Sequence, residues 1–508
     1  MEQQIAITQQ NQENGQASRL RAPGTARGWM QPLYLLLTAV ITITICSKSS
    51  PIYPLNDWVD SNCFLTVGKS MLHGLVPYRD LLEQKGPLLY MLHALAALVS
   101  DTSFLGVYFL EVAACFFYLY YGLKIIRLWL PRANVAAVSP LAALVYASSA
   151  FAHGDSAEEF CLPLLTFALY LALRTYRFDR TLSEREGLAV GVTSACVLWI
   201  KYTMLGFYFG WFVAMALWFA AHGKGRQLAA MTLDIAIGVM LPSILIVLYF
   251  TVNGAVGDLF TVYFYNNLFY YSKLDGASGS SFWGNLSKGW SSLVRYNALS
   301  LNLAVAGLLS LLGRKRARAA AALACMAVSS FVFVYLGGWT LRYYSFIFCA
   351  FAPVGMAAVY AAAAACLRCG ARVRTALACA VCALSIFLTW NNCPNTYLLA
   401  YEKSDLPQYQ FAEIISQTED ATLLNYGFLD GGFYTVADIV PTCKYFCYLN
   451  IALPEIMQTQ RAYVAQGRVD YVVTRNSELQ AENYELVAQS TFPYDGSDYV
   501  YRLYRLIS

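Results

Sequence analysis

Two carboxylates stand close together in a polar stretch that follows the first long apolar run of the chain. Asp57 and Asp60 lie between Lys48 and Lys85, in a segment broken by Gly and Pro turns. A carboxylate beside a membrane surface can accept a proton from a reacting hydroxyl as a general base. The alternative is a solvated loop with local ion pairs, and composition alone gives the two interpretations about equal weight.

A second acidic group lies far along the sequence, immediately before another apolar run. Its members are Asp155, Glu158 and Glu159. Ionisable residues at membrane depth are costly and usually functional. Acidic residues also stabilise the positive end of a helix dipole, which explains one of the three but not all of them.

Several charged residues near these groups could contact an anionic substrate. Lys201 and Arg342 stand alone at the ends of apolar runs, where a phosphate or an acidic side chain would compensate them and where snorkelling to lipid headgroups is an equal alternative. Cations placed near a departing phosphate stabilise the charge that builds on it, and a divalent metal ion held by carboxylates would do the same. The candidates for contacts with a donor phosphate or substrate are Arg79, Asp80, Lys85, Asp155, Glu158, Glu159, Lys201 and Arg342.

The composition requires a membrane around these residues. The 508 residues are 58% hydrophobic and only 13% charged. Apolar runs of roughly 17 to 25 residues are long enough to cross a hydrocarbon core. The net charge of +4 comes from short basic clusters between apolar runs, so it carries no nucleic-acid signal.

We predict an all-α polytopic membrane protein of about eleven spans. The spans begin near Leu33, Phe104, Val135, Phe160, Gly187, Gly206, Ala229, Leu301, Ala319, Tyr343 and Ala376. With the N-terminal tail in the cytoplasm, every basic cluster falls on the cytoplasmic side, as the positive-inside rule demands. This requires the apolar stretch from Gly86 to Ser100, about 15 residues long, to lie at the outer interface and not to cross the membrane.

This topology divides the chain into three parts. Residues 1–30 form a polar cytoplasmic tail, residues 31–390 form the multi-span domain with outer loops at 48–103 and 253–298, and residues 391–508 form a small extracytoplasmic α/β domain. In the last part we predict helices at Asp405 to Glu419 and Glu455 to Gln466. Strands are predicted at Thr422 to Tyr426, Tyr471 to Thr474 and Tyr499 to Ile507.

The loop motifs resemble those of a known family. They are Asn56-Asp57-Trp58-Val59-Asp60, Gly74-Leu75-Val76-Pro77-Tyr78-Arg79-Asp80, Lys85-Gly86-Pro87-Leu88, and Glu158-Glu159 before a span. Together with the many-span layout and the C-terminal domain, they resemble the GT-C membrane glycosyltransferases, in particular the protein O-mannosyltransferases, the aminoarabinose transferases and related bacterial enzymes.

The resemblance implies an inverting transfer of sugar from a polyprenyl-phosphate donor to a glycan, lipid or protein acceptor of the cell envelope. It implies a catalytic carboxylate in the first outer loop, for which Asp60 is the better match and Asp57 the competitor, because the family's adjacent acidic pair is separated here by two residues. It also implies a contact between Lys85 and the lipid phosphate. Membrane lipids are the other expected partners, and no cofactor is certain beyond the possible divalent metal ion.

Other functions fit the sequence less well. No Walker loop, dinucleotide fingerprint or nucleophile elbow is present, which removes support for nucleotide-driven and serine-hydrolase chemistry. The main alternative is a transporter or lipid flippase, for which we would expect charges near the bilayer midplane and internal repeats. A non-catalytic envelope protein would leave the carboxylates unexplained. Cys443 and Cys447 could pair, although an i,i+4 helical separation strains a disulfide.

Overall fold

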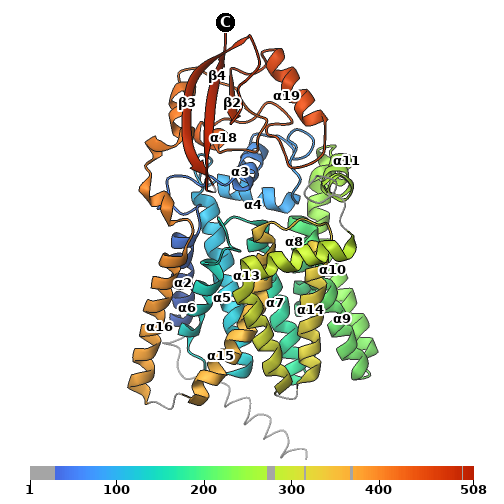
Figure 1. Cartoon of the computed structure of the whole chain (residues 1–508). Helices are drawn as coiled ribbons and strands as arrows, with labels where there is room; N and C mark the ends of the chain where they lie inside the picture. The colour runs from blue at the N-terminus through green and yellow to red at the C-terminus, as the bar shows by residue number, and fades with distance from the viewer. Residues whose placement is uncertain (1–28, 272–280, 314–315, 367–369, 495, 508) are drawn as a thin grey trace, which may run out of the picture.

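The structure, a computed structural model, describes residues 29–271, 281–313, 316–366, 370–494 and 496–507. It consists of a bundle of long helices with a small mixed sheet at one end, and two short helices lie between these parts (Figure 1). We refer to the two ends of the bundle as the sheet end and the far end. Of the predicted polar tail, residues 1–30, the first 28 residues lie outside the described part of the chain.

The bundle is built from the apolar runs. Its helices are α2 (Met30–Cys46), α5 (Leu105–Trp129), α6 (Val138–Tyr146), α7 (Ala157–Phe178), α8 (Glu184–Lys201), α9 (Leu205–Ala221), α10 (Gly225–Val252), α13 (Phe282–Gly313), α14 (Ala317–Tyr335), α15 (Ala352–Cys366) and α16 (Ala371–Asn392). A 3₁₀ segment, η5 (Arg342–Phe351), leads into α15. Each of the eleven predicted spans coincides with one of these helices.

Seven helical stretches in the described part are long and apolar enough to cross a membrane, and one of them joins α8 and α9. The protein is therefore a membrane protein. The predicted span near Val135 is shorter than expected, because α6 with the preceding turn covers only Val135–Tyr146. At 1.5 Å per residue it extends roughly 18 Å, well short of a hydrocarbon core of about 30 Å. The chain that follows, from Ala150 to Phe160, is buried.

The basic loops gather at the far end. The guanidinium of Arg177, in the last turn of α7, donates to the carbonyl of Leu128 at the end of α5, at 3.4 Å. Arg316, before α14, donates in turn to the carbonyl of Arg177 at 3.4 Å. The alternation of helices between the two ends therefore brings loops distant in sequence together, as the predicted topology requires.

The short helices α3 (Val59–Leu72) and α4 (Pro87–Ala97) lie between the bundle and the sheet (Figure 1). Helix α4, predicted as an interfacial segment, has 11 residues and is too short to span. Its start is defined by Pro87 in the first turn, where the missing N–H costs no helical hydrogen bond. The two helices pack on each other and position the first loop above the bundle.

The sheet has the strand order β1-β2-β4-β3. Strands β1 (Leu423–Tyr426) and β2 (Tyr471–Arg475) are parallel, and β4 (Ser497–Leu506) pairs antiparallel with both β2 and β3 (Tyr484–Tyr494). Helices α17 (Pro407–Ile415), α18 (Phe433–Val436) and α19 (Glu455–Ala465) accompany it. The predicted helices and strands of this region are confirmed, and β3 is an additional strand that the sequence did not reveal.

The C-terminal region is anchored on the first loop. The backbone N–H of Leu82 donates to the carbonyl of Lys444 at 2.8 Å, and the Tyr409 hydroxyl donates to the carbonyl of Pro54 at 3.0 Å. On α3, the Thr66 hydroxyl donates to the buried carboxylate of Asp430 at 2.6 Å. The loops and helix α17 of the C-terminal region therefore hold the first loop and α3.

Candidate active site

Asp60 lies in the first turn of α3, where the helix dipole favours a negative charge. Its Oδ2 accepts a hydrogen bond from the Tyr343 hydroxyl at 3.0 Å and lies 3.4 Å from the Nζ of Lys85. The side chains of Asp60 and Lys85 keep 15% and 13% of their surface exposed. The carboxylate is therefore oriented by two partners and remains accessible.

Lys85 is positioned by the glycine that follows it. The N–H of Gly86 donates to the carbonyl of Ile200, at the end of α8, at 3.1 Å. A Cβ at residue 86 would overlap the carbonyl of Trp199, so only glycine permits this approach. Burial opposes the charge on Lys85, but the carboxylates of Asp60 and Glu83 raise its pKa above the ordinary value. Lys85 therefore remains a cation.

Lys201, the last residue of α8, provides a second cation beside the first. Its Nζ lies 2.5 Å from the Glu158 carboxylate and 3.6 Å from the centre of the Tyr344 ring. Glu158 lies in the first turn of α7, after Ser156, whose hydroxyl caps the helix by accepting the N–H of Glu159 at 3.1 Å. One residue from each of the two acidic groups of the sequence is thus paired with a neighbouring lysine. Asp60 pairs with Lys85, and Glu158 pairs with Lys201.

Both lysines line one cavity of about 680 Å³. Most of the remaining lining is aromatic or apolar, including Tyr263, Phe264, Leu268, Phe333 and Trp339, and its polar members are Gln84, Thr203 and Asn267. Tyr271 and Tyr344 also line it, with their hydroxyls 3.2 Å apart. A cavity that combines two cations with mostly apolar walls suits an anionic head attached to a long apolar chain.

Asp57 is in a different environment from Asp60. Its Oδ1 lies 2.5 Å from the Nζ of Lys48, and the two side chains are 3% and 1% exposed. Trp58 stands between this pair and the Asp60 group, with its ring 5.4 Å from the His153 ring and 5.2 Å from the Tyr343 ring. The structure therefore places the two competing carboxylates on different sides of one tryptophan.

Arg342 lies on the Lys48 side of Trp58. Its Nη2 lies 2.5 Å from the Nε2 of His153, and both residues line a second hollow, of about 330 Å³, together with Lys48 and Asn395. The hollow reaches the C-terminal region at Pro493. Arg342 therefore lines a different space from the two lysines.

Asp155 and Glu159 belong to a fully buried network. The N–H of Asp155 donates to Glu111 at 2.8 Å and to Glu159 at 2.9 Å, and the Asp155 carboxylate lies 3.0 Å from the Nε2 of His93. Ser47 donates to Glu111 at 2.8 Å. These carboxylates hold the loop before α7 in place and do not line either cavity.

Arg79 and Asp80 form an ion pair with each other at 2.7 Å, and their side chains are 40% and 26% exposed. Arg79 holds the pKa of Asp80 below its usual range. Arg79 also donates to the carbonyl of Asn253 at 2.7 Å. The structure does not bring this pair to the cavity that Lys85 and Lys201 line.

Tyr343 and Tyr344 are residues that the sequence analysis did not select. They follow Arg342 directly, and η5 turns one toward Asp60 and the other beneath Lys201. The available signal was an arginine followed by two tyrosines at the end of an apolar run. Lys48, the partner of Asp57, was noted only as the start of the loop.

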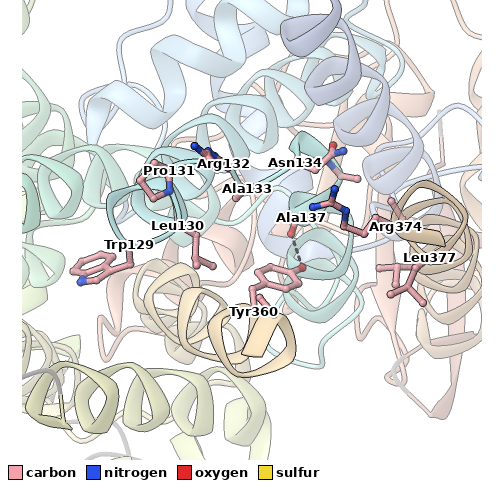
Figure 2. A pocket seen from close by; sticks show the side chains of 14 residues that line it. Trp129, Leu130, Pro131, Arg132, Ala133, Asn134, Ala137, Tyr360, Arg374 and Leu377 are labelled. Atoms are coloured by element: carbon pink, nitrogen blue, oxygen red, sulfur yellow. Dashed lines mark hydrogen bonds between the residues drawn. The ribbon is translucent and has the colours of Figure 1, made fainter. Parts of the chain in front are cut away.

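Another cavity, of about 690 Å³, lies where α5, α15 and α16 meet at the far end (Figure 2). Its lining includes Trp129, Arg132, Tyr360 and Arg374, and the Tyr360 hydroxyl donates to the carbonyl of Ala137 at 2.8 Å. No acidic residue lines it. It therefore lacks the carboxylate that general-base chemistry requires.

Among the described residues, no group of three or more His, Cys, Asp or Glu side chains is arranged to hold a metal ion. The positive charges in the lining of the 680 Å³ cavity come from Lys85 and Lys201.

Solved structures resemble this chain over nearly its whole length. ArnT from Cupriavidus metallidurans in the apo state aligns with a TM-score of 0.59 at 12% identity, covering 94% of this chain and 98% of that one. The same protein bound to undecaprenyl phosphate aligns with a TM-score of 0.58 at 13% identity, with the same coverage. The fold of this chain is that of ArnT.

This likeness confirms the predicted GT-C fold, with its many-helix bundle and small C-terminal sheet. At this identity the ArnT structures establish the architecture alone. No protein-family model matches the chain, and a search of curated proteins finds no match either.

Proposed function

We propose that this protein is a membrane glycosyltransferase that moves a sugar from a polyprenyl-phosphate carrier to an acceptor of the cell envelope. The observation that carries the proposal is the cavity of about 680 Å³ that combines two lysines with mostly apolar walls, with Asp60 3.4 Å from Lys85. An ArnT of the same fold has been solved with undecaprenyl phosphate bound.

The donor lies with its phosphate between Lys85 and Lys201 and its isoprenoid chain along Tyr263, Phe264 and Leu268. As the bond from the anomeric carbon to the phosphate oxygen breaks, negative charge grows on the phosphate, and the two ammonium groups stabilise it. Asp60 accepts the proton of the acceptor hydroxyl while that oxygen bonds to the anomeric carbon from the opposite face, so the configuration inverts.

The remaining predicted residues act around this centre. Glu158 fixes the position of Lys201, and Arg342 lines the second hollow, apart from the donor cavity. Asp57 holds Lys48, while Asp155 and Glu159 hold the loop before α7. Arg79 and Asp80 pair on the surface. We thus assign Lys85 and Lys201 to the donor phosphate and Asp60 to the proton.

We infer that the far end of the bundle faces the cytoplasm and the sheet end faces outward. The support is that the arginine-bearing loops contact one another at the far end, and basic loops remain cytoplasmic. On this basis the sugar is transferred at the outer face of the plasma membrane, and residues 391–508 form an extracytoplasmic domain.

The test is to incubate the purified full chain in detergent with a panel of polyprenyl-phosphate sugars and envelope acceptors. We expect one donor to be consumed with release of polyprenyl phosphate, and Asp60→Asn to abolish the release. A flippase would instead move the intact lipid across a vesicle membrane and leave the sugar attached. Donor translocation without consumption would therefore overturn the proposal.

A further inference from the structure

Cys63 and Cys447 form a contact between α3 and the C-terminal region. Their Sγ atoms lie 3.7 Å apart, although the two residues are separated by 384 positions in sequence. Each residue is only 1% exposed. Two thiols in van der Waals contact need only a small side-chain rotation to reach the S–S bond length of about 2.05 Å.

The backbone on both sides of this contact is held firmly. One turn along α3 from Cys63, the Thr66 hydroxyl donates to Asp430 at 2.6 Å, and Lys69 pairs with Asp438 another turn on. The packing at Gly432 is close enough that a Cβ there would press on the amide of Asn62, beside Cys63. The interface therefore brings the two cysteines together independently of any bond between them.

We propose that Cys63 and Cys447 form a disulfide that joins α3 covalently to the C-terminal region. The proposal rests on the outward orientation of the sheet end inferred above, because disulfides persist in oxidising compartments outside the cytoplasm. The two thiols give up two protons and two electrons, and the disulfide of a thiol–disulfide exchange protein accepts them and becomes a dithiol.

The bond forms as the C-terminal region docks on α3, before the interface closes over the two thiols. In the docked state both thiols are sealed from solvent, and burial raises the pKa of each thiol, which suppresses the reactive thiolate. Thiols that meet an oxidant during folding are exposed and react normally. Docked reduced protein should therefore resist both oxidation and alkylation.

Cys443 is not the partner of Cys447 in this arrangement. It packs with Leu424, Val464 and Val472 on one side of the sheet, whereas Cys447 belongs to the larger apolar core that contains Cys63. In this proposal a cross-link between distant segments takes the place of the strained Cys443–Cys447 pairing that the sequence left open. That link encloses 384 residues and constrains the unfolded chain far more than a four-residue loop would.

The test is a disulfide map of the full chain, exported to the membrane of a host with an oxidising envelope. The purified protein is denatured in N-ethylmaleimide and digested without reduction. We expect a linked pair of peptides carrying Cys63 and Cys447, which separates after reduction. Alkylation of both cysteines in the unreduced sample, or a link from Cys447 to Cys443, would overturn the proposal.

Two variants serve as controls. Cys443→Ser should keep the link, and Cys63→Ser should leave Cys447 open to alkylation after denaturation. In addition, a reductant should lower the melting temperature of the wild-type protein and leave that of Cys63→Ser unchanged. Equal sensitivity of the two proteins would contradict a stabilising cross-link.

The outcome is independent of glycosyl transfer. A linked chain that consumes no donor would remove the proposed function and keep the disulfide. An active enzyme with free thiols at Cys63 and Cys447 would support the proposed function and remove the disulfide.

Discussion

Asp57 and Asp60 are three residues apart, and each is paired with a lysine. The two ion pairs nevertheless differ in length and in exposure. The Asp57–Lys48 pair is short, at 2.5 Å, and buried, with exposures of 3% and 1%, although Lys48 also lines the second hollow. The Asp60–Lys85 pair is longer, at 3.4 Å, keeps 15% and 13% of its surface, and adjoins a cavity. A buried pair holds structure together, whereas a loose and accessible pair can exchange its partner for a substrate.

The largest effect should come from Asp60→Asn. Loss of a positioned general base lowers the rate by about 10² to 10⁴-fold. The yield and melting temperature of the folded protein should change little, because the amide can still accept the bond from Tyr343. The measurement is the rate of donor consumption beside a thermal melt. Wild-type turnover in this variant would remove Asp60 from the mechanism.

Asp57→Asn should act on stability in place of rate. It leaves the buried Lys48 ammonium without its carboxylate, and breaking a buried pair in this way costs about 3–5 kcal/mol. The double variant Asp57→Asn, Lys48→Met removes the uncompensated charge and should recover much of the loss. Thermal melts of the three proteins measure this. If Asp57→Asn were as stable as the wild type, the Asp57–Lys48 pair would have no structural role that distinguishes it from the Asp60–Lys85 pair.

Lys85→Ala should weaken donor binding and leave the fold intact. A hydrogen bond to a charged group contributes about 1.5–3 kcal/mol, which corresponds to roughly a 10 to 100-fold rise in the apparent dissociation constant of the donor. Arg79→Ala is the matched control, because Arg79 lies six residues earlier and pairs at the surface with Asp80. Equal effects of the two variants would contradict a phosphate contact at Lys85.

Asp430 offers a third carboxylate for the comparison, held by neutral donors. It accepts hydrogen bonds from Thr66, Asn425 and the Gly432 N–H, and burial raises its pKa to about 6. Since the folded pKa exceeds the unfolded value, this residue stabilises the fold more at low pH and loses that contribution as the pH rises through 6. Between pH 7 and pH 5 the contribution of Asp430 to the free energy of unfolding should increase by about 1 kcal/mol.

The check on Asp430 is the difference in unfolding free energy between the wild type and Asp430→Asn, followed from pH 7 to pH 5. The amide of Asn cannot titrate, so the difference in unfolding free energy should increase by about 1 kcal/mol over this pH range. A difference that is constant with pH would show that this carboxylate does not take up a proton on folding.

Much of this architecture is predictable because the membrane imposes simple rules. Apolar runs gave the helices, and the positions of the arginines gave the alternation between two ends. The short helix α4 followed from the length of its apolar run. Strand β3 was missed because polar residues such as Gln489, Ser490 and Thr491 interrupt its apolar run, and Pro493 near its end is tolerated because β3 is at the edge of the sheet.

The candidate site was predictable only in part. Residue type and loop position selected Asp60, Lys85, Glu158 and Lys201. Local sequence carries no information on which lysine meets which carboxylate, since that depends on how α3, α7 and α8 pack. For the same reason Tyr343 and the pairing of Cys63 with Cys447 emerged only from the folded chain.

The hydrogen bond between Gly86 and Ile200 has one more consequence. It connects the backbone beside Lys85 to the backbone beside Lys201, so thermal motion moves the two lysine backbones together. The spacing of the two lysine backbones is then fixed by the main chain, and the room between the two ammonium groups changes only through the rotamers of their flexible side chains.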